Sequence, residues 1–167
     1  MSEFSRPIDI AKLPPGETIH EVAATAAERA ALARRFSLLA LDRLEARIGL
    51  QRLAGGLIRL DAKLSADVVQ ECVVTLEPVA SRIEDSFTLL YGAAADEAGE
   101  VTLSGEAELV EPLAGHTVDI GEAVAQQLSL ALDPFPRAPG IEAAALPAAD
   151  SKAESPFAAL AKWKRKG

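Results

Sequence analysis

Alternation of apolar and polar residues is the dominant pattern of the chain, and it is longest between residues 56 and 91. From Ile58 to Val68 every second residue is apolar, and the residues between them are charged or polar. Because only a β-strand places successive side chains on opposite faces, this pattern predicts a long strand with one buried and one solvated face. The alternation resumes after Pro78, which indicates an antiparallel partner strand joined through residues 72–78.

Residues 38–52 carry two competing periods. Leu41, Leu44 and Ile48 suit a helical face, whereas the residues from 44 to 50 alternate as in a strand. We favour the strand because a Gly-Gly pair at 55–56 supplies a turn into the next strand. The predicted fold class is α+β. It comprises an antiparallel β-meander with strands near 42–53, 57–72 and 79–91, packed by two helices, with a flexible C-terminal tail.

The two helices are predicted from capping residues. The first covers residues 24–36, where Thr25 and Glu28 have the spacing of a capping box. The second starts at Asp119 with Glu122 as its capping partner, and it ends at Pro134 because proline forces the preceding residue out of the helical region. Short strands are expected around residue 7, at 19–23 and at 107–111, and a mobile loop is expected at 92–105.

The last thirty residues change in character. Residues 136–154 contain prolines and little periodicity, which predicts a flexible linker. In residues 155–167, Ser155 and Pro156 suit the start of a helix, and Phe157 and Leu160 follow at helical spacing. The chain is therefore divided into a single α+β domain at 1–135, a flexible linker at 136–154 and a basic amphipathic C-terminal motif at 155–167.

Charge is unevenly distributed along the chain, which has a net charge of -8. Residues 1–65 carry ten Lys/Arg and eight Asp/Glu, residues 66–150 carry two and sixteen, and residues 151–167 carry five and one. Because nucleic-acid affinity comes largely from basic side chains at phosphates, the acidic middle would repel RNA. RNA contact is expected from the first third or the tail. The acidic residues either solubilise the surface or attract a basic protein.

The predicted meander also offers a basic patch that could bind phosphate. Glu45 and Asp61 interrupt this patch. We favour the alternative of a solvated sheet face without a ligand, because antiparallel sheets commonly leave one side in water. The candidate residues of the patch are Arg43, Arg47, Arg52 and Arg59.

Few residues could carry catalysis or bind a metal. Cys72 is the single cysteine, and both histidines are far from it in sequence, so no set of zinc ligands is assembled. We expect Cys72 to be a small buried hydrophobic side chain, with Glu71 disfavouring its thiolate. Asp119 is explained as a helix cap rather than as a triad partner of His116. The chain is therefore predicted to be no enzyme, with no metal, cofactor or small-molecule substrate.

The sequence also bears on location. Its apolar runs are shorter than the roughly 18 residues that span a bilayer. The first ten residues lack the basic and apolar regions of a signal peptide. A single cysteine agrees with a reducing compartment. We therefore expect a cytoplasmic protein without a membrane partner.

Three segments together resemble the YceD family, the large ribosomal RNA subunit accumulation proteins, in its alphaproteobacterial type. They are LSADVVQECVVTLEPV at 64–79, VDIGEAVAQQLSLALDPFPRAPG at 118–140 and SPFAALAKWKRK at 155–166. The resemblance implies a role in large-subunit rRNA accumulation and ribosome assembly, without an established enzymatic activity. Many relatives carry Cys-x-x-Cys at the turn. Thr75 stands at the second position here, so we expect the turn to be structural.

The terminal motif is the expected contact with a partner. It combines apolar anchors with charges suited to phosphate, and its tryptophan could stack on an exposed base. Its candidate residues are Pro156, Phe157, Leu160, Lys162, Trp163, Lys164, Arg165 and Lys166.

Two hypotheses remain open. In the first, the chain binds precursor rRNA or a ribosomal protein through its tail and the arginine-bearing helix at 24–36. In the second, the acidic middle acts as an adaptor or holdase for a basic ribosomal protein, with no direct RNA contact.

Overall fold

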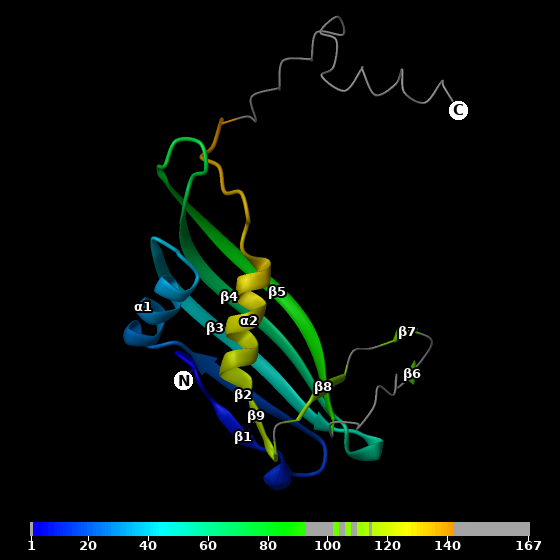
Figure 1. The fold of residues 1–167 in the computed structure, drawn as a ribbon. Helices are drawn as coiled ribbons and strands as arrows, with labels where there is room; N and C mark the ends of the chain where they lie inside the picture. Colours follow the sequence, from blue (N-terminus) through cyan, green and yellow to red (C-terminus); the bar gives the residue numbers. More distant parts are fainter. Residues whose placement is uncertain (1, 93–101, 104–105, 108–109, 114, 142–167) are drawn as a thin grey trace, which may run out of the picture.

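A mixed five-stranded sheet with two helices on one face forms the body of the protein (Figure 1). The computed structural model describes residues 2–92, 102–103, 106–107, 110–113 and 115–141. The predicted α+β class is confirmed, and the three predicted meander strands correspond to β3, β4 and β5. In spatial order the strands of the sheet are β2 (Glu17–Ala23), β3 (Ala40–Arg52), β4 (Ile58–Glu71), β5 (Pro78–Gly92) and β8 (Val110–Pro112).

The sheet extends beyond the predicted meander at both edges. β2 adds antiparallel to β3, and β8 adds parallel to β5, so the sheet is mixed. Two further pairs of short strands lie apart from it: β1 (Pro7–Asp9) with β9 (Thr117–Asp119), and β6 (Thr102–Leu103) with β7 (Glu106–Ala107). The short 3-10 turns η1 and η2 cover Ile10–Lys12 and Ala54–Gly56.

β3 resolves the competition between the two periods in favour of a strand. Its pairing with β4 shifts register between Leu41 and Arg43, where Asp42 is the extra residue of a bulge. Because of this bulge, Leu41 and Leu44 are both buried although they lie three residues apart. The helical spacing of Leu41 and Leu44 in the sequence is therefore explained by a bulge in a strand and not by a helix.

The two helices cover the same face of the sheet (Figure 1). α1 (Ala26–Arg35) packs on β3, and α2 (Ile120–Ala131) packs on β4 and β5. Every second residue of β4 is buried against this layer, as the alternation predicts. Full burial of a Val, Leu or Ile side chain stabilises a fold by about 1.5–3 kcal/mol, so this face anchors the core. The β4 members are Ile58, Leu60, Ala62, Leu64, Ala66 and Val68.

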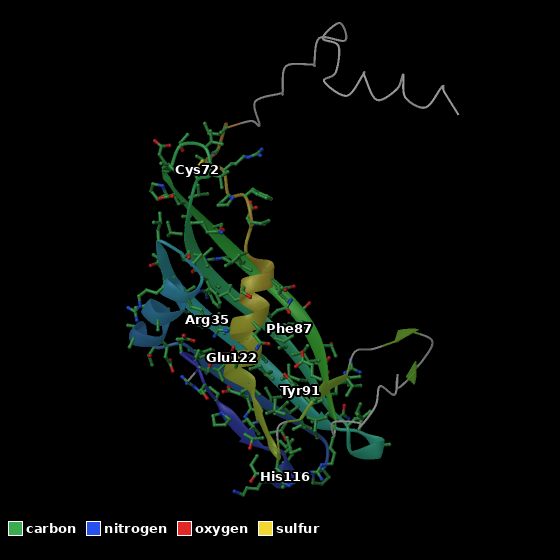
Figure 2. All side chains as sticks on the ribbon, viewed as in Figure 1. Arg35, Cys72, Phe87, Tyr91, His116 and Glu122 are labelled. Carbon is green, nitrogen blue, oxygen red and sulfur yellow. The ribbon has the colours of Figure 1, made fainter. Side chains whose placement is uncertain are left out.

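The predicted helix caps are present, with one difference. Thr25 and Glu28 form a complete capping box at the start of α1. The Asp119 carboxylate accepts hydrogen bonds from the backbone N–H groups of Gly121 and Glu122 at the start of α2. The side chain of Glu122, however, turns away to Arg35 on α1, with an Oε1–Nη2 distance of 2.7 Å (Figure 2). Glu122 thus joins the two helices instead of capping its own.

The N-terminal segment lies against the start of α2. The short strand predicted around Pro7 is β1, but it pairs with β9 rather than with the main sheet. Phe4 is fully buried in the core. A Cβ placed on Gly121 would lie 2.5 Å from the backbone oxygen of Phe4. Glycine at this position therefore permits the close approach of the two backbones.

Residues 133–141 continue from α2 along the end of the β4–β5 hairpin. The backbone N–H of Val73 donates to the carbonyl of Pro136 over 2.9 Å, and the Gln70 side-chain amide donates to the carbonyl of Asp133 over 2.8 Å. Most of the loop predicted at 92–105 and the tail at 155–167 lie outside the described residues. The division of the chain into a domain at 1–135, a linker at 136–154 and a terminal motif at 155–167 stays a prediction.

We expect the stability of the fold to fall at acid pH. Hydrogen bonds from Arg6 and Arg35 lower the pKa of Glu28 and of Glu122, respectively, from the ordinary 4.5 to about 2. A lowered folded-state pKa stabilises the fold above pH 4.5, and this contribution is lost as the pH falls through 2. Denaturant unfolding across this range should show a steady decline in the free energy of unfolding.

Glu122→Gln is expected to lower the free energy of unfolding at neutral pH by about 1–2 kcal/mol, because both partners of the ion pair are only partly exposed. The free energy of unfolding of this variant should also fall less steeply as the pH is lowered. The matched control is Glu21→Gln, whose 3.5 Å ion pair with Arg47 is well exposed and should contribute less than about 0.5 kcal/mol. Equal losses in the two variants would contradict the assignment.

Gly121→Ala is expected to destabilise the protein by about 1–3 kcal/mol, although alanine is the better helix former. The added methyl group would force the segment around Phe4 out of position. Ser129→Ala, on the exposed side of the same helix, should change stability by less than about 0.5 kcal/mol. Thermal or urea unfolding of the two variants checks this, and a Gly121→Ala protein as stable as the parent would refute it.

Candidate interaction surfaces

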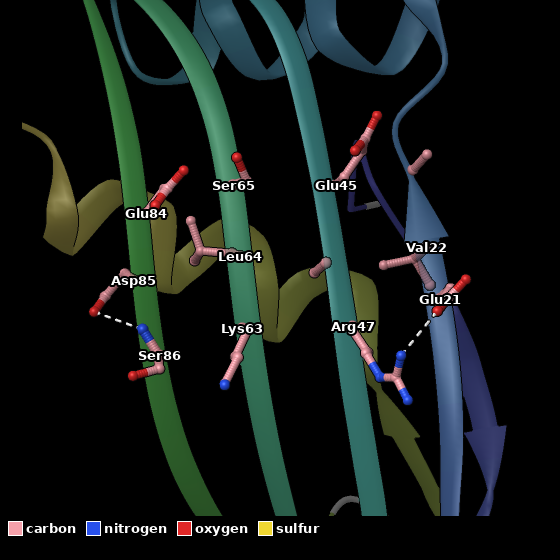
Figure 3. A pocket seen from close by; sticks show the side chains of 12 residues that line it. Glu21, Val22, Glu45, Arg47, Lys63, Leu64, Ser65, Glu84, Asp85 and Ser86 are labelled. Atoms are coloured by element: carbon pink, nitrogen blue, oxygen red, sulfur yellow. Dashed lines mark hydrogen bonds and ion pairs between the residues drawn. The ribbon is translucent and has the colours of Figure 1, made fainter.

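The face of the sheet opposite the helices is open and hollowed. One hollow of about 800 Å³ spans β2, β3, β4 and β5, and a second of about 580 Å³ adjoins it. The two hollows share Arg47, Lys63 and Ser86. Figure 3 shows the first from close by, with α2 behind the sheet. This surface is large enough to receive a segment of a partner.

Ion pairs occupy most of the arginines on this face. Asp67 accepts hydrogen bonds from Arg82 over 2.8 Å and from Arg43 over 3.0 Å. The hydrogen bond from Arg82, followed by that from Arg43, lowers the pKa of Asp67 against the opposing effect of burial. Arg59 lies 2.8 Å from Asp61 on the same strand. Each charge thus has a protein partner, which weakens its pull on an external phosphate.

The proposed four-arginine patch is only partly assembled. Arg43 and Arg47 of β3 and Arg59 of β4 lie on the open face, opposite Asp67, Lys63 and Gln51 respectively. Arg52 does not join them, because the alternation of β3 turns it away, and its guanidinium donates to the carbonyl of Ile10. Lys63 is the one basic side chain of this face for which the described residues provide no ion pair. A strong phosphate site on the sheet is therefore not supported.

The arginines of α1 are mostly structural. Arg35 bonds Glu122 and Glu3, the latter over 3.0 Å. The guanidinium of Arg29 donates to the carbonyl of Ala24 over 2.8 Å. Arg34 is exposed and remains the helix's candidate for an external contact. Of the three arginines of α1, only Arg34 is therefore suited to contact RNA or another partner.

A compact turn closes the β4–β5 hairpin around Cys72. The sulfur of Cys72 is fully buried and accepts hydrogen bonds from the backbone N–H groups of Thr75 and Ala138, over 3.4 and 3.3 Å. The Cys72 N–H donates to the carbonyl of Glu77 over 2.8 Å. The sulfur thus fastens the turn to the segment that follows α2.

The prediction that Cys72 is a small buried side chain is confirmed, and its sulfur in addition accepts hydrogen bonds. Hydrogen bonds from Thr75, then from the backbone of Ala138 and Val74, lower the pKa of the Cys72 thiol from 9.0 to about 7. The lowering comes from hydrogen bonds to the sulfur and not from the positively charged neighbour that the sequence lacks. A sequence signal was present, because the N–H groups of a tight turn commonly point back at the residue that opens it.

The residues considered for catalysis are far apart. Cys72 and His116 lie at opposite ends of the molecule (Figure 2). Within the described residues there is no group of three or more His, Cys, Asp and Glu side chains placed to hold a metal ion. Asp119 caps α2 and also accepts from the backbone N–H of Arg6 over 2.7 Å. In the same part of the chain, no helix is long and apolar enough to cross a membrane.

The residues expected to contact a partner all lie outside the described part of the chain. Their role stays a prediction from the sequence. They are Pro156, Phe157, Leu160, Lys162, Trp163, Lys164, Arg165 and Lys166.

Thr75→Val is expected to raise the pKa of Cys72 toward its ordinary value, because the threonine side chain is the main cause of the lowering. The thiolate absorbance of Cys72 in the ultraviolet, followed against pH, measures this directly because the chain has no other cysteine. Thr88→Val, whose hydroxyl bonds Asp61 on the open face, is the control and should leave the titration unchanged. An unshifted midpoint in Thr75→Val would contradict the contribution of the threonine side chain and leave the lowering to the backbone N–H groups of Thr75 and Ala138.

Comparison with known proteins identifies the family of this chain. Residues 60–164, which include most of β4, the hairpin turn, β5, α2 and most of the terminal motif, match the family model described as Large ribosomal RNA subunit accumulation protein YceD. Neither the curated proteins nor the solved structures give a match. Since the family model covers more than half of the sequence, the chain belongs to the YceD family of large ribosomal RNA subunit accumulation proteins.

Proposed function

We propose that this protein is a non-enzymatic, cytoplasmic factor in ribosome assembly that contacts precursor large-subunit rRNA through its terminal motif. The family supplies the link to large-subunit rRNA accumulation. In this proposal the domain at 1–135 is a scaffold. The segment at 136–154 is a linker, and the motif at 155–167 makes the contact.

The single observation that carries this proposal is that most arginines of the body are paired with carboxylates. Arg35, Arg43 and Arg59 are each held by a carboxylate. Four basic residues at 162–166, in contrast, follow one another within five positions, with no acidic residue among them. Dense positive charge releases counterions from a nucleic-acid backbone, and the tryptophan in their midst can stack on a base.

A second candidate is the acidic adaptor. The larger hollow of the open face is lined by the carboxylates of Glu21, Glu45, Glu84 and Asp85, against Arg47 and Lys63. This excess of negative charge would attract a basic segment of a ribosomal protein. In that case the effect on rRNA would be indirect, and the tail would be dispensable for the contact.

In-cell crosslinking followed by pull-down of the tagged protein, with and without residues 151–167, separates the two candidates. We expect large-subunit rRNA to be recovered with the intact chain and lost with the truncated one. Recovery of basic ribosomal proteins alone, equally with both chains, would overturn the tail-led proposal and favour the adaptor.

Charge substitutions test the same contact in solution. Lys164→Gln with Arg165→Gln should weaken binding to a large-subunit rRNA fragment and reduce the slope of log K against log salt by about 1.5, as expected for two lost phosphate contacts. Lys12→Gln with Arg82→Gln removes the same charge from exposed positions of the body, where the two side chains are paired with Asp9 and Asp67, and is the matched control. An equal loss of RNA affinity in both double variants would mean that binding depends on the net charge of the protein and not on the terminal motif.

A further inference from the structure

The end of the β4–β5 hairpin carries an unusual concentration of exposed apolar side chains. We call this surface the hairpin tip and define it by residues 71–77 and 133–138. Seven large hydrophobic residues of the described chain are exposed, and four of them belong to the tip. Their exposed fractions are 49% for Val73, 58% for Val74, 68% for Leu76 and 67% for Phe135. Clustered exposure of this kind marks an interaction surface.

These side chains are held on an ordered backbone. Val73 donates its N–H to Pro136, and Leu76 donates its N–H to the carbonyl of Cys72 over 3.0 Å. The buried sulfur of Cys72 then receives the N–H of Ala138 from the other segment. Both halves of the tip are therefore fixed before anything binds, which reduces the entropy that docking would cost.

The described chain leaves the body at the tip. The orange end of the described chain lies beside the turn between β4 and β5 (Figure 1). Ile141 is the last described residue, and its N–H donates to the carbonyl of Ala138 within the tip segment. Thirteen residues, 142–154, separate it from Ser155. A flexible chain of that length has an end-to-end distance of about 20 Å, so the terminal motif would visit the tip at an effective concentration on the order of 1 mM.

The two surfaces have complementary chemistry. The tip places Glu71, Glu77 and Asp133 beside its apolar residues, against one basic residue, Arg137. In the terminal motif, Phe157, Leu160 and Trp163 follow one another at helical spacing, and the basic residues lie at its C-terminal end, at 162–166. Apolar anchors would meet apolar side chains while lysines and arginine meet carboxylates. At millimolar effective concentration, even a dissociation constant of about 1 mM would keep the motif docked half of the time.

We propose that the hairpin tip is the docking site of the chain's own residues 155–167. In the free protein, Phe157, Leu160 and Trp163 cover Val74, Leu76 and Phe135. The motif is released when its partner binds, a consequence that rests on the function proposed above. The tip and the partner thus compete for one amphipathic segment.

The fluorescence of Trp163 tests this docking without any partner, because it is the single tryptophan of the chain. In the intact protein we expect blue-shifted emission and protection from acrylamide quenching, compared with a synthetic peptide of residues 155–167. Val74→Asp with Leu76→Asp should shift the emission to that of the peptide and abolish the protection. Leu76 has a φ of 62°, a conformation that Asp tolerates, and both side chains are exposed, so the body should stay folded.

Ile19→Asp is the matched control, since Ile19 is an exposed apolar residue of β2, away from the tip. It should leave the emission of Trp163 unchanged, while circular dichroism confirms that all variants are folded. Emission of the intact protein equal to that of the peptide would overturn the proposal. So would a blue shift that survives Val74→Asp with Leu76→Asp, because the tryptophan would then be covered elsewhere.

The outcome of the fluorescence experiment does not depend on that of the rRNA pull-down. If the tail docks on the tip but binds no RNA, the fluorescence result stands while the pull-down fails. If both proposals hold, Val74→Asp with Leu76→Asp should increase rRNA recovery by the full chain, because it frees the motif. A lower recovery would contradict competition between the tip and the RNA.

Discussion

The apolar face of β4 must be covered, and the rest of the fold follows from that requirement. β4 pairs along its length with β3 and β5, so its backbone polar groups are satisfied within the sheet. Its alternate side chains then form one continuous apolar surface, which no strand can bury by itself. α2 lies on this surface, α1 covers the neighbouring β3, and Phe4 completes the core from the N-terminus. The opposite face is left in water, and its arginines are paired with carboxylates on the same or a neighbouring strand.

The ion pair between Arg35 and Glu122 ties the two covering helices to each other. The guanidinium of Arg35 also contacts Glu3, so one side chain joins the N-terminal segment, α1 and α2. A side chain used in this way contributes to the fold and is withdrawn from recognition. The same holds for Arg43 and Arg82, which share Asp67 on the open face. Few basic side chains of the body are therefore free to bind RNA, and we expect the terminal motif to make this contact.

Cys72 shows how a buried sulfur can organise a turn without a second cysteine. It accepts two backbone N–H groups, one from the turn itself and one from the segment after α2. Those bonds hold Val73 and its neighbours outward, with their side chains in solvent. A polarised thiol and an exposed apolar surface thus arise from the same local geometry.

The sequence by itself determined the local elements. Alternation located β4 and β5, and the capping residues Thr25 and Asp119 located both helices, because these patterns depend on neighbours within a few positions. It also indicated the family, through segments that the family model spans.

Only the tertiary structure decided which distant groups meet. The bulge at Asp42, the ion pair of Glu122 with Arg35 and the hydrogen bond from Ala138 to Cys72 all depend on residues that no local pattern relates. The physical reason is that hydrogen bonds and ion pairs depend on distances of a few ångströms. Those distances are fixed only when the helices close on the apolar face of β4.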